Sequence, residues 1–299
     1  MSLILQQLIV LYVFLSLGWL FGTKKPALRE QTGLLSFLLV NLLLPCKVFL
    51  SFSTNFTLSY LQNSYQTIFI SVGLLLILHL LGKPVGKLLS RDETEKSVLE
   101  YSVTISNYAY MGYTLAEGIW GSRMLTDLVL FCIPFAMYTY TVGYMKLTGS
   151  KKNLKRLFNP MTVAIALGMI WGLCGIPVPA VLRTAAQSAS ACVGPLSMLL
   201  TGFVLSTFSF SSLWGSPRDY VMVVLRLVVL PAFVWGLFWL CGLKSFSTPA
   251  LLMASMPTGL NTIIFTKNAG RSPALGARLA FLSGILSIVT LPLWLSILQ

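Results

Sequence analysis

Two polar interruptions lie inside long apolar stretches of this chain. The first, at 104–114, reads TISNYAYMGYT, and the second, at 254–262, reads ASMPTGLNT. Proline removes a backbone donor and glycine weakens a helix, so both segments are predicted to break one. In hydrocarbon the freed backbone groups are tolerated only where protein or a water-filled cavity satisfies them. The candidate substrate-binding residues are therefore Asn107, Tyr108, Gly112, Pro257, Thr258, Gly259 and Asn261.

The chemistry expected at such interruptions is the binding of an anion. The start of a half-helix presents unpaired amide donors and the positive end of the helix dipole. The alternative is a pair of kinks whose Asn side chains join neighbouring helices. The two interruptions are unequal, because the second contains Pro257 whereas the break in the first is expected to rest on Gly112 and polar side chains.

Two basic residues interrupt other apolar runs. Lys47 is a further candidate substrate-binding residue, because its ammonium could attract a carboxylate. An ionisable group within the membrane is costly unless it is paired or hydrated. Its long stem could instead reach the membrane interface, or the ammonium could bind a carbonyl. Arg226 lies close to the end of its run, so it is expected to reach the interface.

Acidic residues and histidine give little sign of a metal or ion site. Glu100 and Glu117 lie near opposite ends of one run and Asp127 near the start of the next, so none is central enough to predict a sodium site. His79, the only histidine, is expected to be a packed residue. No metal and no cofactor is expected.

The elements that carry these residues are membrane-spanning helices. Of 299 residues, 56% are hydrophobic and 10% charged, far from the balance of a soluble domain. A span needs about 20 apolar residues, which leaves no room for a soluble catalytic domain. The sequence predicts an all-α polytopic membrane protein with ten transmembrane helices, at 3–22, 32–52, 65–82, 97–120, 124–146, 159–176, 189–210, 219–242, 249–268 and 275–297.

Loop charges predict the orientation. One set of loops contains 16 basic residues: Lys24, Lys25, Arg29, Lys83, Lys87, Arg91, Lys96, Lys146, Lys151, Lys152, Lys155, Arg156, Arg218, Lys267, Arg271 and Arg278. The other set contains three: Arg123, Arg183 and Lys244. By the positive-inside rule the richer set faces the cytoplasm, which puts both termini on the extracytoplasmic side. Because the net charge of +13 is concentrated in these loops, it does not indicate a nucleic-acid partner.

Ten spans allow two inverted five-helix repeats, because the second half then starts on the opposite side from the first. Residues recur at an offset of 150: Gly18 with Gly168, Gly22 with Gly172, Pro45 with Pro195, and Asn107 with Pro257. The predicted division is a first repeat at 1–147, a cytoplasmic hinge loop at 148–158 and a second repeat at 159–299. Spans four and nine are the broken crossover helices.

Several motifs in combination resemble the auxin efflux carrier family. They are LP at 44–45, NYAYMG at 107–112, NP at 159–160, GIP at 175–177, GPLSMLLTG at 194–202, RLVVLP at 226–231 and MPTGLN at 256–261. The resemblance covers nearly the whole chain. Two departures are the absence of a proline soon after Gly112 and the presence of Lys47 where an apolar residue is more usual.

The resemblance implies two inverted repeats whose fourth helices cross as broken segments, an elevator-type mechanism, and homodimers formed through scaffold helices, here spans two and seven. Family members include exporters of the auxin anion and bacterial proteins assigned to dicarboxylates. The short central loop is similar to that of bacterial members, which implies the bacterial inner (plasma) membrane.

We therefore expect a secondary transporter in the lipid bilayer that moves a small organic anion, a carboxylate, by efflux or facilitated transport. A sodium-coupled symporter similar to the bile acid symporters and a non-transporting membrane receptor are the open alternatives. An intramembrane enzyme is disfavoured, because the spans contain no evident nucleophile–base pair or metal cluster.

Overall fold

The computed structural model describes residues 3–151 and 153–298, and every regular element within them is a helix. Lys152 of the predicted hinge loop, and the outermost residues 1, 2 and 299 of the two predicted repeats, lie outside these ranges. Seven described helices are long and apolar enough to cross a membrane: Leu3–Lys24, Thr32–Asn55, Leu58–Leu89, Ser122–Thr148, Ala180–Leu205, Pro217–Leu240 and Ala274–Ser296. The helical membrane architecture expected from composition is therefore present.

The described residues form two compact units, and each unit draws on both halves of the sequence. Unit 1 comprises the chain up to Gln66, Ala109–Leu130 and Lys155–Thr207, and unit 2 comprises the remainder. The elements of unit 1 are α1 (Leu3–Lys24), α2 (Ala27–Glu30), α3 (Thr32–Leu38), η1 (Leu39–Leu43), α4 (Leu44–Asn55), α5 (Leu58–Ser64), α8 (Tyr113–Trp120), the first part of α9 (Ser122–Tyr138), η4 (Leu154–Leu157), α11 (Pro160–Cys174) and α12 (Ala180–Leu205).

Unit 2 contains the helices on both sides of the second predicted break and the helix that leads into the first. Its elements are α6 (Gln66–Leu89), α7 (Glu93–Thr104), the end of α9, η3 (Thr139–Gly143), α10 (Tyr144–Thr148), α13 (Phe210–Leu213), α14 (Pro217–Val224), η5 (Leu225–Val229), α15 (Leu230–Leu240), η6 (Lys244–Phe246), α16 (Ser247–Ser255), α17 (Asn261–Asn268) and α18 (Ala274–Ser296). The short η2 (Tyr108–Gly112) contains the boundary between the units.

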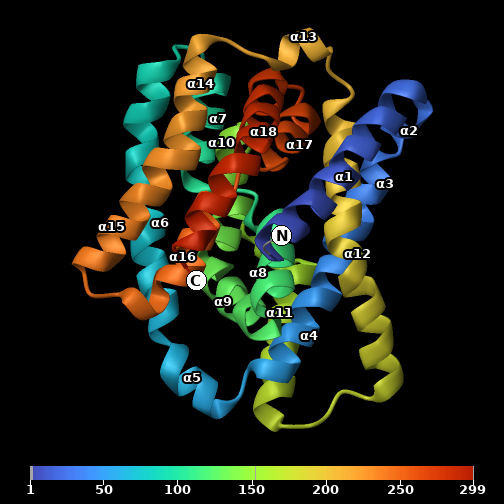
Figure 1. Ribbon diagram of the computed structural model, residues 1–299, viewed down its shortest axis with the longest axis vertical. Helices are drawn as coiled ribbons and strands as arrows, with labels where there is room; N and C mark the ends of the chain where they lie inside the picture. Colours follow the sequence, from blue (N-terminus) through green and yellow to red (C-terminus); the bar gives the residue numbers. More distant parts are fainter. Residues whose placement is uncertain (1–2, 152, 299) are drawn as a thin grey trace. The chain divides into compact units, whose positions relative to one another are not determined.

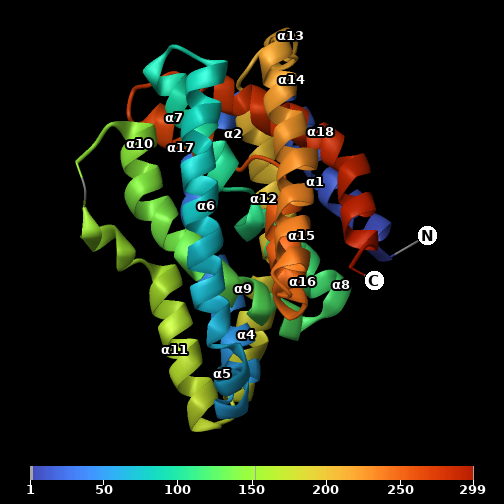
Figure 2. The ribbon, with the colours of Figure 1, turned by 90° about the vertical axis from the view of Figure 1, so that its left-hand side faces the viewer.

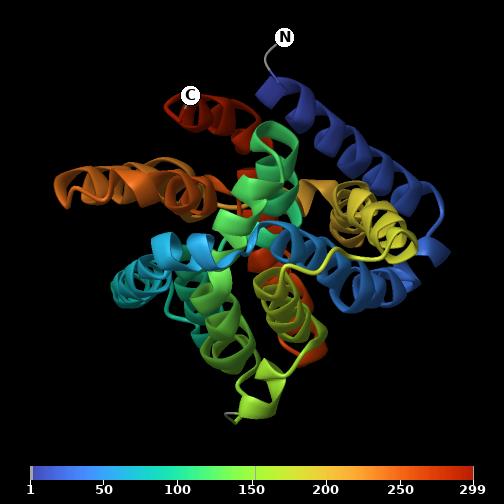
Figure 3. The ribbon, with the colours of Figure 1, turned by 90° about the horizontal axis from the view of Figure 1, so that it is seen from below.

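Unit 1 is built around two close helix pairs. Helix α1 packs against α12, and α11 packs against α4 (Figures 1 and 3). Glycines permit the approach. A Cβ on Gly18 of α1 would collide with the carbonyl of Leu199 on α12, and a Cβ on Gly168 of α11 would lie 3.0 Å from the carbonyl oxygen of Phe49 on α4. Small residues of this kind let helix backbones pack closely where lipid provides no hydrophobic drive.

Two spans contain a wide turn directly before a proline. In η1 the amide of Leu44 bonds the carbonyl of Leu39, and in η5 the amide of Leu230 bonds the carbonyl of Leu225. Pro45 and Pro231 follow immediately, where the ring removes a donor from the helix ladder. The π-helical turn lets each span continue through its proline, and Figure 2 shows α14 and α15 as one column.

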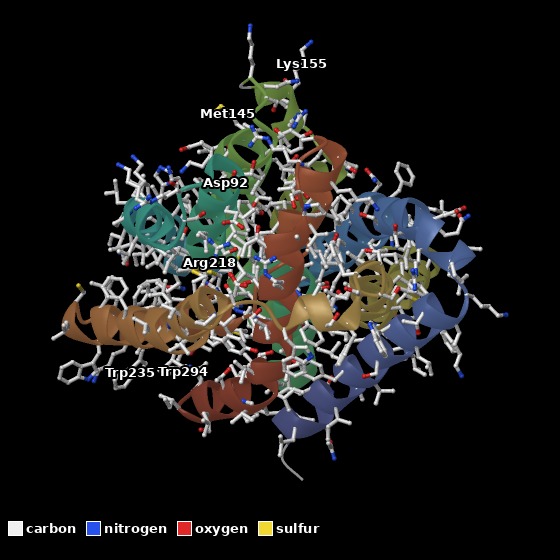
Figure 4. The ribbon with its side chains drawn as sticks, turned by 90° about the horizontal axis from the view of Figure 1, so that it is seen from above. Asp92, Met145, Lys155, Arg218, Trp235 and Trp294 are labelled. Carbon is white, nitrogen blue, oxygen red and sulfur yellow. The ribbon has the colours of Figure 1, made fainter. Side chains whose placement is uncertain are left out.

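An ion-pair cluster joins one end of three helices of unit 2. Arg278 of α18 donates to Asp219 of α14 at 2.7 Å, and Arg218 donates to Glu95 of α7 at 2.8 Å. Figure 4 labels Arg218 here and Trp294 towards the other end of α18. Trp294 donates to the carbonyl of Leu227 at 2.7 Å, so α18 is tied to the α14–α15 column at two levels.

Candidate functional site

The first predicted break is present, at 105–107. Helix α7 ends at Thr104, and Ile105 has the extended backbone angles φ −117° and ψ 133°. Asn107 is buried, as are the flanking residues Ser106 and Tyr108. The irregular backbone is therefore enclosed by protein, as a break at membrane depth requires.

The second break lies at 256–260. Helix α16 ends at Ser255, Met256 is extended with φ −65° and ψ 146°, and α17 starts at Asn261. Pro257 and Gly259 lie between the two half-helices, and all residues from Met256 to Leu260 are buried. Proline fixes its own φ and disfavours a helical conformation in the residue before it, which accounts for the extended Met256.

The two breaks contact each other within unit 2. The amide of Asn107 donates to the carbonyl of Pro257 at 2.8 Å, and the hydroxyl of Ser106 donates to the carbonyl of Met253 at 2.7 Å. Gly259 lies against the same segment, since a Cβ there would be 3.4 Å from the carbonyl oxygen of Ser106. The chain thus brings together two broken helices from opposite halves of the sequence.

Arg226 stabilises the ends of both first half-helices. Its guanidinium donates to the carbonyl of Val103 on α7 at 3.2 Å and to three carbonyls at the end of α16, those of Met253 (3.3 Å), Ala254 (3.0 Å) and Met256 (3.1 Å). The last carbonyls of a helix have no intrahelical partner and carry the negative end of its dipole. One buried cation therefore satisfies the C-terminal ends of two helices.

The expectation that Arg226 reaches the membrane interface is wrong. The residue is 1% exposed and belongs to the wide turn η5, which faces the crossing. Its distance in sequence from the end of the span did not reveal the two helix ends packed beside it. The sequence signal for this role is an arginine inside an apolar span in a chain with two predicted helix breaks, because the carbonyl groups at a buried helix end need a donor.

One side chain and one backbone N–H of the second break donate to neighbouring helices. The Asn261 amide donates to the Tyr101 hydroxyl on α7 at 3.1 Å, and the backbone N–H of Thr258 donates to the hydroxyl of Ser283 on α18 at 3.0 Å. Tyr101 and Ser283 are buried, and both were missed from sequence. Asn261 itself is only partly buried, so it stays open to a ligand beside the start of α17.

The predicted site residues divide between the two units. Asn107, Tyr108 and the second-break residues Pro257, Thr258, Gly259 and Asn261 belong to unit 2, whereas Gly112 and Lys47 belong to unit 1. The expectation that Gly112 breaks its helix is wrong. Its angles, φ −62° and ψ −45°, are helical, and the break occurs five residues earlier at Asn107. The π-helical η2 carries the chain from that break into α8.

Lys47 neither reaches an interface nor binds a carbonyl. Its side chain is 2% exposed and forms an ion pair with Glu117 of α8. Glu100 likewise pairs with Lys146, within unit 2. His79 contacts the Tyr138 hydroxyl through Nδ1 at 3.0 Å and packs edge-on against its ring, which is the packing role expected for it.

The second break of unit 2 contains polar groups that a ligand could contact. In the first turn of α17 the N–H groups of Ile263 and Ile264 donate to the carbonyl of Leu260, and the first N–H groups of a helix, here those of Asn261 and Thr262, have no intrahelical partner. The partly open Asn261 side chain lies at the same helix end. Among the described residues no group of three or more His, Cys, Asp or Glu side chains is placed to hold a metal ion. Hydrogen-bond donors and a helix dipole are what this part of the molecule offers to a ligand.

Comparison with known proteins identifies a family and a relative of this chain. A family model described as membrane transport protein matches the chain twice, over residues 3–155 and 145–295. The chain is also 24% identical over 300 residues to a protein of Methanothermobacter thermautotrophicus described as an uncharacterized transporter. That alignment covers 97% of this chain and 96% of the relative. Family and relative alike are transporters, which supports a role other than catalysis.

Proposed function

Because the chain belongs to the auxin efflux carrier family of membrane transport proteins, we propose that it is a secondary transporter of a small organic anion, a carboxylate. The site is the crossing of the two broken helices in unit 2. The observation that carries this proposal is the main-chain bond from Asn107 to Pro257, which puts two helix breaks in one place.

The preference for an anion follows from what lines the crossing. The amide-rich start of α17 favours negative charge, and the C-terminal ends of α7 and α16 are already occupied by Arg226. With those negative dipole ends neutralised, the positive N-terminal end of α17 is left for the substrate. Asn261 supplies an amide beside it, held by Tyr101.

An architecture of two inverted repeats supports alternating access. The seven long helices, the shorter apolar α11 and the two broken pairs make up the ten crossings of this proposal. The contact of Gly18 with Leu199 recurs as Gly168 with Phe49, and each residue differs from its counterpart by 150 positions. Such an exchange of partners is what a pseudo-two-fold axis between repeats produces, and the repeated family match agrees with it.

The division of the chain into two units supports transport by an elevator-type movement. Unit 2 contains the crossing and would carry the substrate, and unit 1, built from α1, α4, α11 and α12, would be the scaffold. We further propose that both termini are extracytoplasmic in a bacterial plasma membrane, and that spans two and seven form a homodimer interface. Large apolar residues exposed on span two, such as Leu34 (59%) and Phe37 (61%), support an apolar partner or lipid there.

Transport of radiolabelled malonate into proteoliposomes tests the proposal. Asn261→Leu should abolish uptake, because it removes the amide at the start of α17 without changing the backbone crossing. Lys244→Gln is the matched control, since Lys244 is exposed in the loop region before α16. Unchanged malonate flux in the Asn261→Leu protein, at equal reconstitution, would remove the crossing as the site.

The same assay separates the alternatives. Flux that requires sodium would favour a sodium-coupled symporter similar to the bile acid symporters. Malonate binding to the purified protein without any flux would favour a receptor. Flux that persists without sodium agrees with the present proposal.

A further inference from the structure

A polar pocket lies entirely within unit 1, which does not contain the predicted crossing site. It has a volume of about 260 Å³ and is lined from α4, α8, the start of α9 and α12. Its polar lining includes Lys47, Ser51, Glu117, Arg183, Gln187 and Ser190. We call it the Lys47 pocket.

The buried wall of this pocket contains an ion pair. Lys47 is 2% exposed at its side chain and pairs with Glu117, and its Nζ lies 3.5 Å from the hydroxyl of Ser190. Glu117 is 37% exposed, so water reaches the carboxylate while the ammonium is enclosed by protein. Since a buried ammonium is costly, a lysine at this depth is expected to serve a purpose beyond packing.

Arg183 gives the pocket a net charge of one positive unit. It lies in the first turn of α12 and is exposed, and Lys47 and Glu117 cancel each other. A guanidinium binds a carboxylate through two parallel N–H donors. Gln187 is one helical turn further along α12 and Ser190 lies a further three residues on, so three donors follow one face of the helix towards Lys47.

We propose that the Lys47 pocket is a second anion site, which binds a small carboxylate through Arg183, Gln187 and Ser190. One net positive charge and about 260 Å³ suit an acid of a few carbon atoms. Arg183 belongs to the loops predicted to be extracytoplasmic, so the pocket takes the anion on that side. Its role in capturing or releasing the transported anion rests on the proposed function, whereas binding itself does not.

Equilibrium binding of radiolabelled malonate to the full-length protein in nanodiscs tests the inference. The wild type should show two sites. Arg183→Gln keeps hydrogen-bonding capacity but removes the charge, so it should weaken one site at least about tenfold, which corresponds to about 1.4 kcal/mol. Lys244→Gln, the matched loss of an exposed charge, should leave both sites unchanged. Uncharged malonamide should not compete at the Arg183-dependent site.

This experiment tests the site at the crossing and the Lys47 pocket independently of each other. Asn261→Leu should remove the Arg183-independent site and retain the other. A single wild-type site that Asn261→Leu removes, or no binding at all, would overturn the second site. Equal weakening by Arg183→Gln and Lys244→Gln would show only general surface attraction and would also overturn it. Loss of transport in Asn261→Leu alongside an intact Arg183-dependent site supports both proposals.

Discussion

The backbone amide of Asn107 donates to the carbonyl of Pro257 at 2.8 Å, so the two helix breaks meet through main-chain atoms. The Asn107 side chain is not needed for this bond, although asparagine is what marked the position in the sequence. Pro257 contributes twice, because its ring ends α16 and its carbonyl receives the partner segment.

Substitution of Asn107 by proline should uncouple the breaks. The substitution removes the N–H and leaves the buried Pro257 carbonyl without this donor, at a cost of about 1–3 kcal/mol. We expect a lower melting temperature in detergent and loss of malonate transport. Asn107→Ala retains the N–H and is the control for the crossing, so it should keep most of the thermal stability. Equal melting temperatures for the proline and alanine variants would contradict a structural role for the bond.

Among the basic residues of unit 2, substitution of Arg226 should lower the melting temperature most. Arg226→Met leaves carbonyls of Val103, Met253, Ala254 and Met256 without their donor, each worth about 1–3 kcal/mol when buried. Arg226→Lys retains the charge but has fewer donors on a point-like head, so its melting temperature should fall between wild type and Arg226→Met. A thermal-shift series in one detergent measures this order. Wild-type stability of Arg226→Met would show that the guanidinium does not hold the helix ends.

Local sequence predicted the helix breaks well and the contacts between distant residues poorly. Proline and glycine affect the backbone of the residues next to them, so the break at Pro257 can be predicted from the local sequence alone. The partners of Lys47 and Arg226 are set by packing between helices that are distant in sequence. Glu117 is 70 residues from Lys47, and the carbonyls bound by Arg226 carry no side-chain signal at all.

The break near Asn107 shows the same limit. Gly112 was the expected cause because glycine has low helix propensity, yet it has helical angles and the chain becomes extended at Ile105. What holds that extended segment is tertiary, the bonds from Ser106 and Asn107 to the other break. Asn107 and Pro257, which an offset of 150 residues relates in the sequence, do lie in the two segments that meet.

The helix pairs of unit 1 should be intolerant of added methyl groups. In Gly18→Ala the new Cβ meets the backbone of Leu199, and in Gly168→Ala it meets that of Phe49, so each helix must move apart at a cost of about 1–3 kcal/mol. Gly73→Ala in α6 is the matched control, because its Cβ enters open space and alanine favours the helix. Melting temperatures should fall for the first two variants and stay level or rise for the third. A fall for Gly73→Ala of the same size would point to a general effect of glycine replacement.

The Lys47–Glu117 pair should be asymmetric in its effect on stability. Lys47 is 2% exposed and Glu117 37%, so Glu117→Gln leaves a charge buried, whereas Lys47→Met leaves a carboxylate that water can reach. We expect Glu117→Gln to lower the melting temperature more than Lys47→Met does, and the double variant to recover most of the difference. The Lys146–Glu100 pair, with exposures of 19% and 17%, is the control, and its two single variants should be about equal. A larger loss for Lys47→Met than for Glu117→Gln would mean that the carboxylate, not the ammonium, depends on its partner.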